Sequence, residues 1–209
     1  MRLSGPGRIA GAAAGILLAA LAGLGLWLWT PDKSREELES RYLDAPTDMM
    51  DLEGLRLHVR DGGPREAPAV ILIHGFGSSL HTWEAWARGL SAGHRVIRFD
   101  LPGSGLSEPD PTGDYTIGRS VAILQALMGR IGVERASLVG NSLGGRVAWN
   151  FAARNPGRVE KLVLISPDGF ASPGEEYGRR TEIPLPLRLM RYALPRILLS
   201  MNLAPAYGD

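Results

Sequence analysis

The residues best suited to do chemistry lie in the segment 138–145, which reads LVGNSLGG. Ser142 stands at the centre of a G-x-S-x-G pattern that follows an apolar run and precedes a helix-like segment. In that context a serine is held on a tight strand-to-helix turn, and the helix N-terminus favours developing negative charge. The sequence therefore predicts Ser142 as a nucleophile, and the alternative is a serine in an ordinary glycine-rich turn.

A serine hydroxyl is a poor nucleophile until a base removes its proton. Histidine is the usual base, and the four histidines of the chain all precede Ser142 and none follows it. The pattern around Ser142 thus predicts a nucleophile without identifying its base. The histidines are His58, His74, His81 and His94.

A second glycine-rich segment, His74-Gly75-Phe76-Gly77, directly follows the apolar run 68–73. A turn of this kind can aim a backbone N–H at a carbonyl oxygen, so we expect an oxyanion hole formed by the N–H groups of Phe76 and Leu143. We expect His74 to brace this loop by hydrogen bonding, and the alternative is a role in proton transfer. The loop 100–107 is predicted to be a structural turn in which Asp100 caps backbone groups.

Hydrophobic patterns place these loops between regular elements. Apolar runs predict buried strands, and apolar residues at helical spacing predict the helices between them. Alternation within 48–60, with Glu53-Gly54 as the turn, predicts a short antiparallel hairpin. Alternating strands and helices indicate βαβ units and a mostly parallel sheet covered on both faces. The expected strands are 68–73, 95–99, 136–139 and 159–165, and the expected helices are 80–90, 115–131 and 143–154.

The segments PAVILIHGFGSS, RFDLPGSGLS, LVGNSLGG and KLVLISP, in this order and spacing, resemble the α/β-hydrolase fold superfamily. The similarity covers about residues 50–168 and is greatest to its esterase, C–C-bond hydrolase and haloperoxidase-like branch. It implies that Ser142 is the nucleophile, that Phe76 and Leu143 form the oxyanion hole, and that a mobile cap begins at Pro167. Serine at the elbow argues against the dehalogenase and epoxide hydrolase branches, which place aspartate there.

The resemblance also implies a later acid and histidine, in the chain order serine, acid, histidine. No histidine follows Ser142, so we expect the acid and the histidine to be missing from this chain. Asp168, directly after the strand 159–165, is the alternative acid. We expect a fold truncated at the C-terminus, because a sheet that stopped at 159–165 would expose an apolar edge. We expect the chain alone to be inactive, since loss of the base costs on the order of 10⁶ in kcat.

The N-terminal region has a separate character. Residues 9–29 carry no charge, and a helix of that length spans roughly 30 Å, the thickness of a hydrocarbon core. Trp27 and Trp29 lie at its far end, as interfacial residues do, and Arg2 and Arg8 precede it. The sequence predicts a single-pass anchor with the following domain on the periplasmic or extracellular side. A signal peptide cleaved after 20–22 (ALA) is the alternative.

Composition excludes several function classes. The chain of 209 residues has 23 basic and 22 acidic residues and no cysteine, so disulfides and cysteine metal sites are excluded. No basic run points to nucleic acid, and no pattern predicts a metal, a cofactor or an oligomeric state. The expected organisation is a cytoplasmic segment (1–8), a transmembrane anchor (9–29), a linker (30–47), the N-terminal part of an α/β-hydrolase core (48–168) and the start of a cap (169–209).

Two functions follow from these observations. The first is a membrane-anchored serine hydrolase that acts on an ester or a similar small apolar carbonyl substrate through an acyl-serine at Ser142. The second is a non-catalytic, membrane-tethered binding module that has kept the elbow in a degenerate hydrolase fold.

Overall fold

The computed structural model describes residues 6–29, 31–169, 185, 188 and 200. The chain divides into two compact units, one made of Met1–Lys33 with Gly178–Asp209 and the other of Ser34–Tyr177. The described part of the first unit contains helix α1 (Pro6–Leu28). Its segment Ala10–Trp27 is uncharged, long enough and apolar enough to cross a membrane, and none of it is buried. A signal sequence has the same length and composition.

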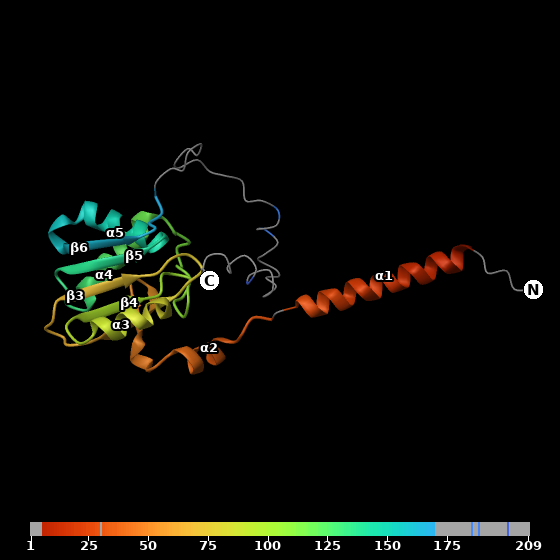
Figure 1. Ribbon diagram of the computed structural model, residues 1–209, viewed down its shortest axis with the longest axis horizontal. Coiled ribbons are helices and arrows are strands. Elements are labelled where there is room, and N and C mark those ends of the chain that lie inside the picture. Colours follow the sequence, from red (N-terminus) through yellow and green to blue (C-terminus); the bar gives the residue numbers. More distant parts are fainter. Residues whose placement is uncertain (1–5, 30, 170–184, 186–187, 189–199, 201–209) are drawn as a thin grey trace, which may run out of the picture. The chain divides into compact units, whose positions relative to one another are not determined.

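The second unit is built on a six-stranded sheet in the order β1-β2-β4-β3-β5-β6 (Figure 1). The pairs β1/β2 and β2/β4 are antiparallel, and β4, β3, β5 and β6 run parallel to one another. The mostly parallel sheet predicted from the sequence is therefore confirmed. The strands are β1 (Met49–Leu52), β2 (Leu55–Gly62), β3 (Ala69–Ile73), β4 (Arg95–Phe99), β5 (Ala136–Asn141) and β6 (Val159–Ile165).

The predicted hairpin joins β1 and β2. Glu53 and Gly54 form its two-residue turn with φ values of 53° and 75°. Positive φ at both central residues is the type I′ geometry, whose twist matches that of the flanking strands. In the resulting register Leu52 pairs with Leu55 and Met50 with Leu57.

The helices of this unit agree with the predicted ones except at their ends. Residues 80–90, predicted as one helix, form a 3-10 turn followed by α3. Helix α4 begins at Ile117 because the Thr116 side chain accepts a hydrogen bond from the N–H of Arg119 and caps it. The α-helices are α2 (Arg35–Tyr42), α3 (Glu84–Leu90), α4 (Ile117–Arg130) and α5 (Leu143–Arg154), and the 3-10 turns are Pro46–Asp48, Leu80–Trp83 and Pro156–Arg158.

Helices cover both faces of the sheet. On one face, β2, β3, β4 and β5 pack against α4 and α5 in a cluster that includes Ile71, Leu124 and Phe151. On the other face, side chains of β3, β4 and β5 pack against Trp83 and Ala87 of the 3-10 turn and α3. Strands β3 and β4 are buried on both faces. For β3 the continuous apolar run predicts this burial, whereas β4 buries Arg95 and Arg98 as well.

The segment predicted as a linker, 30–47, contains helix α2, which belongs to the compact unit that begins at Ser34. The Ser34 side chain caps α2 by accepting a hydrogen bond from the N–H of Glu37. Arg35 links the helix to the loop after β4. Its guanidinium group donates a hydrogen bond to the carbonyl oxygen of Leu106 at 3.2 Å and lies 3.6 Å from the Glu108 carboxylate. The predicted cap, 169–209, lies almost entirely outside the described residues.

Strand β6 is the last strand of the sheet on the side opposite the hairpin. Within the described part of the chain its apolar side chains are substantially exposed, at 39% for Leu162, 43% for Val163 and 36% for Leu164. The sequence predicted this apolar edge.

Candidate active site

Ser142 lies on the turn between β5 and α5 with φ 48° and ψ −116°. A residue other than glycine at positive φ costs about 1–3 kcal/mol and persists only where the surroundings hold it. Here the Ser142 N–H donates to the carbonyl oxygen of Ile165 at 3.0 Å, and the Ser142 carbonyl accepts from the N–H groups of Arg146 and Asp168, both at 3.0 Å. The end of β6 and the first turn of α5 therefore fix the backbone of this serine.

Glycines around Ser142 allow the turn to be this tight. A Cβ on Gly144 would overlap the carbonyl oxygen of Ile73 at the end of β3. A Cβ on Gly140 would overlap the carbonyl of Gly144, so the strand and the helix approach each other backbone to backbone. These two glycines therefore permit the close approach of β5, the start of α5 and the end of β3.

The structure brings the loop after β3 beside Ser142. A Cβ on Gly75 would lie 3.2 Å from Ser142 Cβ and 2.9 Å from Asn141 Oδ1. Phe76 follows in this loop, and its side chain is 91% exposed. Leu143 is the first residue of α5, a position whose N–H has no acceptor within the helix. Of the two residues predicted to form the oxyanion hole, Phe76 thus directly follows the glycine that lies beside Ser142, and Leu143 directly follows Ser142 at the start of α5.

His74 is completely buried and braces this loop, as predicted. Its Nδ1–H donates to the carbonyl oxygen of Gly75 at 2.7 Å, and its Nε2 accepts from the N–H of Leu101 at 2.9 Å. Burial lowers the pKa of His74, so the ring is neutral at pH 7. The two hydrogen bonds use both ring nitrogens of one neutral tautomer.

Asp100 caps backbone groups, as predicted, and holds the far end of the same loop. Its carboxylate accepts from the N–H of Leu80 at 2.6 Å and from the N–H of Leu106 at 2.9 Å. His58 Nδ1 lies 2.8 Å from Asp100 Oδ2. Burial acts to raise the pKa of Asp100, but these hydrogen bonds outweigh it and leave the pKa below its ordinary value. Asp100 is therefore a buried carboxylate.

Sequence reasoning missed His58 as the partner of Asp100. The alternation with Leu57 and Val59 counts His58 among the polar residues of the predicted hairpin. In the structure β2 is an inner strand between β1 and β4, and both of its faces are covered at His58. The position of His58 between the apolar residues Leu57 and Val59 is the sequence signal that could have indicated its burial.

Asp168, the alternative acid, lies after β6 and next to α5. Its carboxylate is 3.3 Å from Arg146 Nη1, its side chain is 51% exposed, and its carbonyl accepts from Trp149 Nε1. Within residues 31–169, none of the four histidine rings hydrogen-bonds to Asp168 or to Ser142. The described residues also contain no group of three side chains arranged to bind a metal ion.

Residues 68–193 match the family model described as alpha/beta hydrolase fold. The 2-hydroxy-6-oxononadienedioate/2-hydroxy-6-oxononatrienedioate hydrolase of Comamonas testosteroni is 38% identical over 128 residues, which cover 58% of this chain and 43% of that protein. The acetyltransferase component of the acetoin cleaving system of Cupriavidus necator is 38% identical over 140 residues, covering 66% of this chain and 35% of that protein. The chain thus spans less than half the length of these curated relatives.

Two solved structures are similar as well. The enol-lactonase of Burkholderia xenovorans LB400 has a TM-score of 0.52 and 34% identity over 55% of this chain and 44% of its own. A membrane phospholipase A, described as a bacterial virulence factor, has a TM-score of 0.59 and 28% identity, and the match covers 88% of this chain and 57% of that one.

Proposed function

This chain belongs to the alpha/beta hydrolase fold family, and on that premise we propose that it is the part of a serine hydrolase that carries the nucleophile, Ser142. The observation that carries the proposal is the conformation of Ser142, held at φ 48° beside the Gly75 loop by hydrogen bonds from two neighbouring segments. Residues with backbone strain of this kind occur most often at functional sites.

The proposed reaction is acyl transfer to Ser142. The hydroxyl oxygen attacks the substrate carbonyl carbon, and the oxyanion that forms accepts hydrogen bonds from the N–H groups of Phe76 and Leu143. Collapse of this intermediate breaks the ester C–O bond, and the alcohol leaves with a proton. Water then hydrolyses the acyl-serine.

The proton requires a general base, which we assign to a histidine outside these 209 residues. His74 uses both ring nitrogens to brace the loop, and His58 is bonded to Asp100. His81 faces Glu84, with its Nδ1 3.5 Å from the carboxylate. These engagements of three of the four histidines support the assignment of the base to a residue that this sequence does not contain.

We further propose that residues 9–29 anchor the protein in a membrane, with the hydrolase unit on the periplasmic or extracellular side. The length and apolar character of α1 support the anchor. The similarity to a membrane phospholipase A over most of this chain supports an ester with an apolar acyl or alkyl group as the substrate.

The test of catalysis compares p-nitrophenyl butyrate hydrolysis by this chain and by the product of the complete reading frame. We expect background rates from the 209 residues alone and turnover from the complete product. Ser142→Ala should abolish that turnover, because the acyl-enzyme cannot form, while Ser120→Ala on α4 should leave it unchanged. Turnover that survives Ser142→Ala would overturn the assignment. Ligand binding without any turnover in the complete product would favour the binding module instead.

The test of anchoring is extraction of membranes with alkaline carbonate, followed by N-terminal sequencing. An anchored protein stays in the pellet with the segment 9–29 intact. Recovery in the soluble fraction, with an N-terminus at Gly23, would show that the segment is a cleaved signal peptide.

A further inference from the structure

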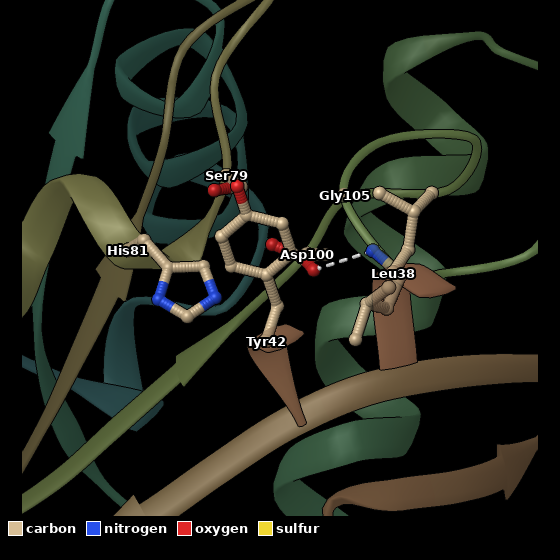
Figure 2. Close-up of a pocket in the computed structure, with 7 residues that line it drawn as sticks. Leu38, Tyr42, Ser79, His81, Asp100 and Gly105 are labelled. Atoms are coloured by element: carbon tan, nitrogen blue, oxygen red, sulfur yellow. Dashed lines mark hydrogen bonds between the residues drawn. The ribbon is translucent and has the colours of Figure 1, made fainter. Parts of the chain in front are cut away.

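A pocket of about 260 Å³ lies between helix α2 and the loops that follow β3 and β4 (Figure 2). Leu38 and Tyr42 enter it from α2, and His81 and Asp100 lie across from them. The pocket does not include Ser142 or any residue of the elbow. It is lined by Leu38, Tyr42, Ser79, His81, Asp100, Gly105 and Leu106.

Helix α2 covers this pocket through contacts at both of its ends. At its start, Arg35 binds the loop after β4 through the carbonyl oxygen of Leu106 and the carboxylate of Glu108. At its end, the Tyr42 carbonyl accepts from Arg60 at 2.9 Å, and the Tyr42 ring packs 5.5 Å from the ring of His81. No residue of α2 is buried. The helix is therefore held over the pocket mainly by these polar and ring contacts rather than by a buried apolar face.

The apolar side chains of the pocket belong to Leu38, Tyr42 and Leu106. They can pack against an alkyl chain. Because a water-sized group occupies about 30 Å³, the volume corresponds to roughly nine such groups. This is the size of an eight-carbon chain with one terminal heteroatom.

One polar atom of the pocket wall has unused hydrogen-bonding capacity. His81 Nε2 is buried and makes no hydrogen bond to any described residue, and Ser79 brings a hydroxyl group to the same pocket. His81 presents Nδ1 to the Glu84 carboxylate, which assigns the ring proton to Nδ1 and leaves Nε2 as an acceptor. Burial and the positive charge of Arg60 lower the pKa of His81, in agreement with a neutral ring.

Asp100 sets the charge of the pocket. Its carboxylate oxygens already accept three hydrogen bonds. The carboxylate therefore brings negative charge to the pocket but has little capacity to accept a further hydrogen bond from a ligand. A carboxylate ligand would meet like charge at short range in a partly buried site, whereas a hydroxyl would not.

We propose that this pocket binds an uncharged alcohol with an alkyl chain of about eight carbons. The chain lies against Leu38, Tyr42 and Leu106. The hydroxyl accepts a hydrogen bond from Ser79 and donates one to His81 Nε2. The inference goes beyond the proposed hydrolase activity, because it requires neither Ser142 nor turnover.

The experiment is photolabelling of the full 209-residue chain in phosphatidylcholine nanodiscs with a diazirine analogue of octan-1-ol. Labelled positions are read by peptide mass spectrometry. We expect adducts on Leu38, Tyr42 or Leu106, and competition by free octan-1-ol. Octanoate at the same free concentration should compete at least tenfold less well, because Asp100 repels it. Hexan-1-ol should compete roughly 15-fold less well, since each buried methylene contributes about fourfold.

Three variants make the test specific. Leu38→Trp fills the pocket and should reduce its labelling at least tenfold, while Ser40→Trp, on the exposed side of the same helix, should not. His81→Phe keeps the ring packing with Tyr42 but removes the acceptor, so alcohol competition should weaken about twofold to tenfold.

Labelling confined to α1, or equal competition by octan-1-ol and octanoate, would overturn the proposal, as would an unchanged signal in Leu38→Trp. Ser142→Ala should label like the wild-type chain. A failure of the hydrolase assignment therefore leaves this result unaffected, and a failure here leaves the hydrolase assignment standing.

Discussion

His58 Nδ1 lies 2.8 Å from Asp100 Oδ2, and neither side chain is more than 1% exposed. Their hydrogen bond joins β2 to the carboxylate that also holds the N–H groups of Leu80 and Leu106. Leu80 ends the loop that begins at His74, and His74 binds the N–H of Leu101. Residues 100 and 101 therefore hold both ends of the loop that lies beside Ser142.

His58→Ala should destabilise the hydrolase unit by about 3 kcal/mol, because it leaves the buried Asp100 carboxylate without one of its donors and opens a cavity. Urea unfolding followed by tryptophan fluorescence measures this loss. His94→Ala, at a partly exposed turn, is the control and should shift the midpoint little. Equal midpoints for the two variants would show that the pair is dispensable.

Glu84 separates two like charges. Arg60 and Arg98 pair directly across β2 and β4, and each places an Nη1 atom 2.9 Å from Glu84 Oε1. Glu84→Gln should destabilise the fold by about 1–3 kcal/mol, because the two largely buried guanidinium groups would then face each other without their shared carboxylate.

The same denaturation measurement tests Glu84 at two salt concentrations. The loss should shrink in 1 M NaCl, where repulsion between the arginines is screened. Glu160→Gln, at an exposed position on β6, should behave like the wild-type chain at both concentrations. A loss that does not depend on salt would contradict the electrostatic explanation.

Gly144→Ala should destabilise by about 2–3 kcal/mol, since the new methyl group would overlap the backbone carbonyl of Ile73, which cannot move aside as a side chain could. Gly129→Ala is a matched control in α4, where a Cβ meets nothing within 4 Å. That change should stabilise by up to about 1 kcal/mol through helix propensity. Thermal unfolding of the pair provides the comparison, and a stable Gly144→Ala protein would refute the close packing at the elbow.

Asp110 should contribute to stability in acid. Hydrogen bonds from Thr112 and then Arg119 lower the pKa of Asp110 to about 2. An unfolded chain would titrate this group near pH 3.9. Its contribution is therefore complete above about pH 4 and is lost as the pH falls from 4 toward 2.

Unfolding temperatures measured from pH 6 to pH 2 test this dependence. Asp110→Asn should lower the unfolding temperature at pH 6 and flatten the decline between pH 4 and pH 2. Asp51→Asn, at an exposed position on β1, should retain the wild-type slope. An unaltered slope in Asp110→Asn would assign the acid sensitivity to other carboxyl groups.

Local patterns were sufficient to predict most of the fold. The apolar run at 68–73 predicted a strand buried on both faces, and the hairpin followed from Glu53-Gly54, whose φ values suit a type I′ turn. The bracing role of His74 and the capping role of Asp100 followed from polar side chains placed at the ends of buried strands.

The partners of these residues could not be predicted, because they depend on strand order. His58 and Asp100 are far apart in sequence and meet because β2 lies next to β4 rather than next to β3. The split of residues 80–90 into a 3-10 turn and α3 likewise escaped prediction, because both parts share one apolar pattern.

By itself the sequence determined the elbow at Ser142, the parallel core of the sheet and the apolar helix near the N-terminus, since each depends on residues that are neighbours along the chain. Only the tertiary structure decided that Asp100 joins β2 to two loops, that Glu84 lies between two opposed arginines, and that α2 covers a pocket. Those relationships depend on which strands and loops become neighbours in space, and hydrophobic periodicity carries no information about that choice.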